Sequence, residues 1–325
     1  MKYLISSLIV IALSCKSTTN ALRPENVFKD AKGNGTAVDP PAMEVESIVS
    51  YLASDELAGR EAGTEGIELA AAYIEDIFKK NNIESYFSTY KDTLSNFSPT
   101  TYNIVGYIEG NDPELKNEFV IVGAHYDHIG TAEAVNGDII ANGANDNAAG
   151  TTAVIELAKH FAYYKSNKRS LLFVLFSAEE SGLLGSAHLA KKLKESDLDL
   201  YTMVNFEMIG VPVTKEYTAY LTGFEESNMA AKINEYAGKN LIGFLPQAKE
   251  YNLFKRSDNY PFYQEFDIPA QTISTFDFTN YEYYHHVDDE VSGMDFEHMV
   301  SIINEMKPVL EKITNSATRE IKMNE

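Results

Sequence analysis

The chain has 325 residues, of which 48 are acidic and 27 basic, so its formal net charge is -21. This surplus of carboxylates argues against nucleic acid as a partner and against electrostatic docking on anionic lipid, because both need clustered basic side chains. Hydrophobic residues make up 44% of the sequence, enough for a large core, which excludes wholesale disorder. The length suits either one α/β domain or two smaller domains.

Residues 1–14 are predicted to be a signal peptide. Lys2 gives a positive start, and the apolar stretch from Tyr3 to Leu13 is shorter than the ~20 residues that cross a membrane. Cys15, the only cysteine, follows directly and resembles the lipidated cysteine of a bacterial lipoprotein, although Ala12 stands where Leu is commonest. The alternative is an incidental cysteine in an ordinary signal peptide. We expect an exported protein of the cell envelope, in the periplasm or at the outer membrane, whose only membrane contact is this lipid anchor.

The remainder of the chain divides into a tether and one domain. Residues 15–42 are polar and contain two glycines and two prolines near their end, which is typical of a segment without regular structure. Residues 43–325 show no internal repeat and no second linker, so we expect a single catalytic domain. Apolar spacing predicts helices within 67–78, 154–161, 183–190 and about 294–315, and strands at 102–108, 119–123, 171–176, 203–206 and 270–274. This alternation predicts a three-layer α/β/α fold with a mixed, largely parallel central sheet.

Polar side chains follow the predicted strands at the points where each strand ends. They are His125 and Asp127, Asp146 before the next helix, the pair Glu179-Glu180, Glu207, and the late Tyr284-His285. Because the carboxyl ends of parallel strands share one rim, these groups should meet there. Carboxylates gathered in this way repel one another unless cations lie between them. Mixed nitrogen and oxygen ligands suit zinc first, with manganese or cobalt as alternatives.

The Glu179-Glu180 pair suggests a division of labour. One carboxylate binds a metal ion, and its neighbour accepts the proton of a metal-activated water. The sequence therefore predicts a metal-assisted hydrolase. It contains neither a GxSxG elbow nor a GxxxxGK[ST] phosphate loop, which leaves serine hydrolysis and nucleotide chemistry without support.

Six segments in order resemble the motifs of the dinuclear zinc aminopeptidase family, whose relatives include glutamate carboxypeptidase and glutaminyl cyclase. They are GAHYDHIG, NGANDNAAG, LFSAEESGLLGS, VNFEMIG, KRSDNYPF and YYHHVDDE, and the resemblance runs from about residue 45 to 315. It implies two zinc ions per chain and an exopeptidase, most simply an aminopeptidase acting on peptides with a free N-terminus.

The resemblance also implies a role for each residue. The metal ligands would be His125, Asp146 as the bridge between the two ions, Glu180, Glu207 and His285. Glu179 would be the general base and then the acid to the leaving amine. Asp127 would orient the imidazole of His125, and Tyr284 would either hydrogen-bond the tetrahedral oxyanion or only pack. Glu207 stands where Asp is more common, which bears on the affinity and identity of its metal ion.

Several assignments have a plain structural alternative. His128 either binds metal with His125 or caps its loop, and we expect the cap. His285 is favoured over His286 as the ligand. Ser257-Asp258 is expected to cap the helix at Pro261, with a role facing the site as the alternative.

Three other functions remain open. A glutamate-carboxypeptidase-like activity needs cations for acidic side chains, and only Lys255 and Arg256 lie near enough in sequence. A glutaminyl-cyclase-like activity usually goes with one zinc ion, whereas His125 and Asp127 favour two. A surface binding protein that has lost turnover would not need the complete set of ligands and base.

Overall fold

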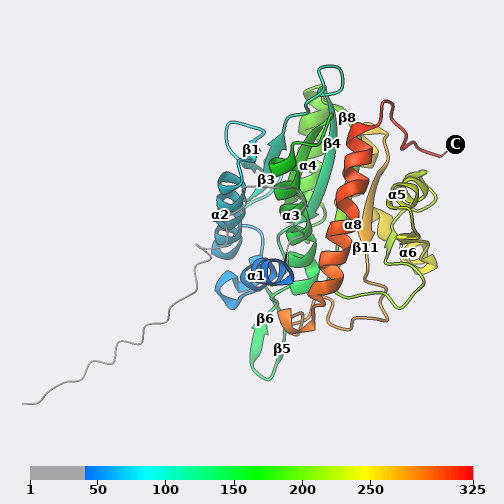
Figure 1. The fold of residues 1–325 in the computed structure, drawn as a ribbon. Helices are drawn as coiled ribbons and strands as arrows, with labels where there is room; N and C mark the ends of the chain where they lie inside the picture. The colour runs from blue at the N-terminus through cyan, green and yellow to red at the C-terminus, as the bar shows by residue number, and fades with distance from the viewer. Residues whose placement is uncertain (1–40, 325) are drawn as a thin grey trace, which may run out of the picture. The chain divides into compact units, whose positions relative to one another are not determined.

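The computed structural model describes residues 41–324, so Cys15, the predicted signal peptide and nearly all of the tether lie outside the described residues. In this part of the chain, nine strands form one sheet in the order β1-β3-β7-β4-β8-β11-β9-β10, with β2 paired to β3 (Figure 1). The strands are β1 Glu84–Ser85, β2 Lys91–Thr93, β3 Tyr102–Ile108, β4 Glu118–His125, β7 Ser170–Phe176, β8 Asp199–Glu207, β9 Ala219–Leu221, β10 Ile242–Gly243 and β11 Ala270–Ser274. The inner four, β7, β4, β8 and β11, run parallel, and antiparallel strands flank them. The prediction of a mixed sheet in one domain is confirmed.

Helices cover both faces of this sheet. They are α1 Ala42–Leu52, α2 Glu65–Lys80, α3 Gly150–Tyr164, α4 Leu184–Glu195, α5 Met229–Ala237, α6 Pro246–Glu250, α7 Asn259–Phe266 and α8 Phe296–Asn315. The apolar residues of α1, α2, α3, α5 and α8 form one core cluster with the sheet, and those of α4 and α7 form another. The three predicted layers are therefore present.

Strand β7 shows why the inner strands are continuously apolar. Leu171, Phe173 and Leu175 belong to one core cluster, while Leu172 and Val174 alternate with them in the other. Successive side chains of a strand point to opposite faces, so a strand covered by helices on both sides needs apolar residues at every position.

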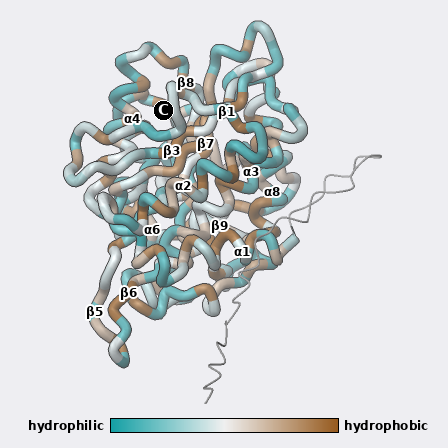
Figure 2. The backbone as a smooth tube through the Cα atoms, turned by 90° about the vertical axis from the view of Figure 1, so that its left-hand side faces the viewer, coloured by the Kyte–Doolittle hydropathy of each residue, from teal (hydrophilic) through white to brown (hydrophobic). Residues whose placement is uncertain are grey.

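Several elements of the structure were not predicted from the sequence pattern. They include α1, the short strands β9 and β10 with helices α5 and α6, and a separate hairpin of β5 Thr131–Val135 and β6 Asp138–Ile140. Figures 1 and 2 show this hairpin projecting away from the layers. No helix within residues 41–324 combines the length and the apolar character that crossing a membrane requires.

Candidate metal centre

Parallel neighbours bring the candidate residues to one rim of the sheet. β4 ends at His125 and β8 ends at Glu207, while Glu179 and Glu180 follow β7. Asp146 comes from the turn Ala144–Ala149 that precedes α3, where the backbone of Asp146 itself is not helical. These carboxyl ends lie side by side because β7 and β8 both pair with β4 in parallel.

His125, Glu179 and Glu207 form a first cluster, whose ligand atoms lie within 4.8 Å of one another. His125 Nε2 lies 2.8 Å from Glu207 Oε1 and 3.3 Å from Asp146 Oδ1. Glu207 therefore reaches His125 with its longer side chain. Its other oxygen, Oε2, accepts a hydrogen bond from Ser257 Oγ at 2.8 Å.

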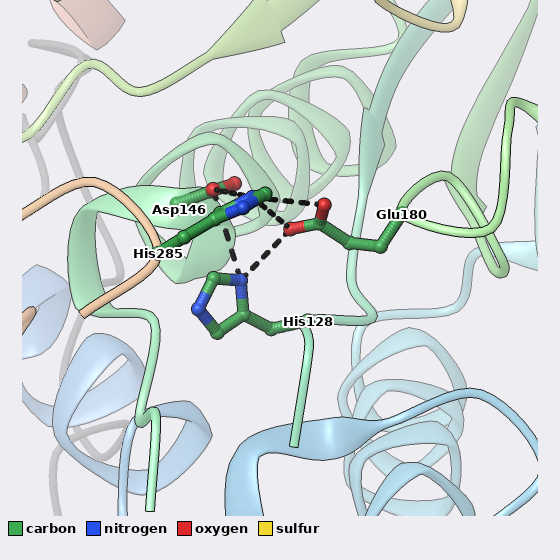
Figure 3. Close-up of side chains that lie close together, drawn as sticks. All are labelled: His128, Asp146, Glu180 and His285. Carbon is green, nitrogen blue, oxygen red and sulfur yellow. Dashed lines mark hydrogen bonds and ion pairs between the residues drawn. The ribbon is translucent and has the colours of Figure 1, made fainter. Parts of the chain in front are cut away.

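His128, Asp146, Glu180 and His285 form a second cluster, again with ligand atoms within 4.8 Å of one another (Figure 3). His285 Nε2 lies 2.9 Å from Glu180 Oε2 and 3.3 Å from Asp146 Oδ2. His286 belongs to neither cluster, and its Nδ1 lies 3.5 Å from Asp288 Oδ2 instead. The preference for His285 over His286 thus agrees with the geometry.

Asp146 lies between the two clusters. Its Oδ1 faces His125 Nε2 at 3.3 Å, and its Oδ2 faces His285 Nε2 at the same distance. The carboxylate is buried, with only 3% of the side chain exposed. A bridging carboxylate needs this arrangement, one oxygen directed at each metal position.

The donor set fits metal cations. Asp146 is buried, and Glu179, Glu180 and Glu207 are partly buried beside it. Burial raises the pKa of Glu179 well above its usual range, against the pull of His125, and the neighbouring Glu207 raises it further. Cations between such carboxylates would remove this penalty. Imidazole nitrogens and carboxylate oxygens at these separations are the ligands that zinc prefers.

Asp127 has a different contact from the one expected. Its carboxylate oxygens accept hydrogen bonds from the backbone N–H groups of Glu179 at 3.1 Å and Glu180 at 3.3 Å. His125 Nδ1 lies 3.1 Å from the backbone carbonyl oxygen of Asp127 and 3.7 Å from its carboxylate. Asp127 therefore fixes the glutamate pair through its side chain and the imidazole mainly through its backbone.

The capping prediction for His128 is wrong, whereas that for Ser257-Asp258 holds for the position only, and the alternative of a site-facing role agrees with Ser257. The buried ring of His128 points its Nδ1 at Glu180 Oε1, 3.0 Å away. Asp258 occupies the N-cap position of α7, but its side chain makes no capping bond. The Ser257 hydroxyl donates its hydrogen bond to Glu207 instead. Burial raises the pKa of Asp258 to about 8.

A hollow of about 530 Å³ opens over the two clusters and includes solvent at its mouth. Tyr284 lies at its edge with its ring stacked on His285 at a centroid distance of 4.0 Å. Partial burial, with the nearby Asp146 and Glu180, raises the pKa of Tyr284, so the phenol stays protonated. Arg256 also lines the hollow, whereas Lys255 does not.

Sequence reasoning missed Arg60, which lies beneath the centre. Its buried guanidinium donates to the backbone carbonyl oxygens of Tyr126, Asn142 and Gly143, at 2.6 to 2.9 Å, and also to that of Leu52. It thereby ties the loop after β4 to the loop that carries Asp146. Nothing in the local sequence pattern marks an arginine as buried.

The sequence from β3 to the middle of α8 matches a known family. Residues 103–306 match the sequence profile described as Peptidase family M28. The chain belongs to this family. All the residues of both metal clusters fall within the matched range.

Individual curated relatives align with part of the chain. A probable leucine aminopeptidase of Trichophyton verrucosum is 31% identical over 208 residues, which cover 61% of this chain and 52% of that protein. Aminopeptidase YwaD of Bacillus subtilis is 30% identical over 168 residues, covering 51% of this chain and 34% of the relative. The chain thus spans about half or less of the curated relatives it matches.

Solved structures share the fold over most of its length. A zinc aminopeptidase from Bacillus subtilis superposes with a TM-score of 0.67 at 16% identity, covering 86% of this chain and 98% of that one. Porphyromonas gingivalis glutaminyl cyclase gives a TM-score of 0.65 at 16% identity, covering 84% and 98%. At such identities the likeness establishes the fold alone.

Proposed function

We propose that this M28 protein is a zinc-dependent aminopeptidase that removes N-terminal residues from peptides. The observation that carries the proposal is the shared carboxylate of Asp146, which faces an imidazole of each cluster at 3.3 Å while Glu179 lies in the first cluster. Two zinc ions held there would polarise the scissile carbonyl and lower the pKa of the attacking water.

The residues of the chain divide the remaining work. Glu179 takes the proton of the attacking water and passes it to the departing amine. The Tyr284 phenol, kept protonated, donates a hydrogen bond to the oxyanion that develops on the former carbonyl. The surplus of carboxylates at the rim attracts the substrate's terminal ammonium.

The test is the metal content of the purified protein together with a panel of aminoacyl-anilide substrates. We expect two zinc ions per chain and release of the N-terminal residue that stops on chelation and returns on adding zinc. A protein with two zinc ions that cleaves no substrate of the panel would contradict the proposal. Cyclisation of an N-terminal glutamine peptide by a one-zinc protein would support the glutaminyl-cyclase-like alternative.

We further propose that the protein is exported and anchored to a bacterial membrane through a lipid on Cys15. The support is the order of Lys2, an apolar stretch and a single cysteine at the N-terminus. A Cys15→Ser variant should lose incorporation of labelled fatty acid and leave the membrane fraction. Unchanged membrane association of that variant would contradict the anchor.

A further inference from the structure

His128 comes from the loop after β4 and reaches the second cluster from a side that neither Glu180 nor His285 occupies. Figure 3 shows its ring directed at Asp146 and Glu180, with His285 beside them. Only 1% of His128 is exposed. Its Nδ1 lies 3.0 Å from Glu180 Oε1 and 3.7 Å from Asp146 Oδ2.

These separations are those of ligands around one ion. With bonds of about 2.0–2.2 Å, neighbouring atoms of a tetrahedral zinc site lie roughly 3.2–3.6 Å apart. The separations from the imidazoles of His128 and His285 to the carboxylates of Asp146 and Glu180 run from 2.9 to 3.7 Å, and all four ligand atoms lie within 4.8 Å of one another. A metal position between these four side chains requires little movement of any of them.

The backbone is shaped to admit the His128 ring. Gly143 has a φ of +60°, and a Cβ added there would come within 2.6 Å of the ring's Cδ2 and 2.7 Å of its Cγ. The same Cβ would come within 2.3 Å of the carbonyl oxygen of Asp146, so a side chain at position 143 would displace the imidazole, the backbone of Asp146 or both. Arg60 supports this arrangement, because it donates to the carbonyl oxygen of Gly143 while its own carbonyl oxygen accepts the His128 N–H at 3.2 Å.

We propose that His128 is a protein ligand of the second metal ion, so that the two positions of the centre are unequal. The second position then has four protein ligands: two imidazoles, Glu180 and one oxygen of Asp146. The first position has His125, Glu207 and the other oxygen of Asp146. Sites with four protein ligands hold zinc structurally, whereas three ligands leave a position for water or substrate.

This asymmetry agrees with the location of the base. Glu179 belongs to the first cluster, the one with fewer ligands, and not to the second. The position of His128 thus predicts that the second position fills first and releases its ion last. The proposal rests on the zinc centre of the proposed function but not on the identity of the substrate.

The experiment titrates zinc alone into the full chain after chelation. Calorimetry should resolve two zinc-binding steps of unequal affinity, and plasma mass spectrometry should count the ions bound after each step. X-ray absorption at the zinc edge, with one equivalent bound, should show two imidazoles around the ion. One imidazole per zinc in that sample would overturn the proposal, and this reading needs no variant that could fail to fold.

Variants separate coordination from hydrogen bonding. His128→Asn keeps an N–H donor near the place of Nδ1 but removes the imidazole, so the first step should weaken on the order of 100-fold or more, beyond what loss of a supporting contact usually costs. His286→Gln removes an imidazole from the same rim outside both clusters and should leave both steps unchanged. If the first zinc ion binds to His128→Asn with unchanged affinity, the ring of His128 only donates a hydrogen bond to Glu180. That result would overturn the proposal.

The two proposals fail differently. Absence of peptide cleavage by a protein with two unequal zinc positions would defeat the aminopeptidase function alone. Two equal steps, each with one imidazole, in an active peptidase would defeat the role of His128 alone.

Discussion

Glu179 and Glu180 are consecutive residues with opposite surroundings. Glu180 contacts two imidazoles, His128 and His285, which lower its pKa against the effect of burial. Burial instead raises the pKa of Glu179, against the pull of His125. Since Asp127 fixes both backbone N–H groups, the two side chains are held to different tasks.

Replacing Glu179 by Gln should remove the base and leave the metal ligands in place. We expect kcat to fall by roughly 10²–10⁴-fold, the usual contribution of general acid–base catalysis. Zinc content and thermal stability should stay close to those of the parent protein. Retention of full activity on the best anilide substrate would contradict the role of Glu179.

Glu207 depends on a neighbour that its own motif does not contain. The Ser257 hydroxyl donates to Glu207 Oε2 and itself accepts from Asn205 Nδ2 at 2.9 Å. Ser257→Ala should therefore free one carboxylate oxygen and weaken zinc at the first position by roughly 10–100-fold. A competition titration would measure this, with Ser292→Ala on the exposed surface as the control. Equal affinity in the two variants would remove Ser257 from the support of Glu207.

At the scale of elements, the 3₁₀ helix Asp55–Arg60 supports the loops that carry the ligands. Ala58, Gly59 and Arg60 all have positive φ values. A Cβ added to Gly59 would come within 2.3 Å of the carbonyl oxygen of Gly130, so the backbone approach there needs glycine. This bend turns the Arg60 side chain inward. Burial there lowers the pKa of the guanidinium to about 10, although nearby carboxylates act to raise it.

Arg60→Met should destabilise the fold and loosen the metal centre together. The loss leaves several buried carbonyl oxygens without a donor, which we expect to cost about 3–5 kcal/mol. Urea unfolding would measure this, and zinc affinity should fall in the same variant. Lys168→Met, at an exposed lysine that does not line the hollow, is the control for charge. An unfolding free energy equal to that of the parent would show that the loops need no internal cation.

The elements that could be predicted from the sequence are those with a clear apolar pattern, and several of them carry residues of the candidate site. The apolar run of β7 predicts a strand covered on both faces, and the residue after such a strand must lie at the rim, which located Glu179 and Glu180. β9 and β10 span three and two residues, too few for any periodicity to register. The contact of His128 with Glu180 depends on the turn after β4 and on the room left by Gly143, so spacing along the chain could not establish it.

At the scale of the whole molecule, the candidate metal centre brings together segments between residues 125 and 285 at one rim of the sheet. Without cations, the rim concentrates negative charge in a chain that already carries -21. Metal ions bound there would oppose this local repulsion and connect loops that are far apart in sequence. Folding and metal binding should be coupled for that reason.

Removing zinc should lower the melting temperature of the protein. Zinc at about 1,000 times its dissociation constant stabilises the folded state by ~4 kcal/mol, which for a domain of this size corresponds to roughly 5–10 °C. Calorimetric scans of the protein with chelator and with zinc restored would measure the effect. The same pair of scans on Glu179→Gln is the control, because this variant keeps its metal ligands and should respond as the parent does. His285→Gln removes one ligand and should show a smaller rise on adding zinc. The same melting temperature with and without zinc would mean that the rim is held by the protein alone, contrary to the coupling expected from its buried carboxylates.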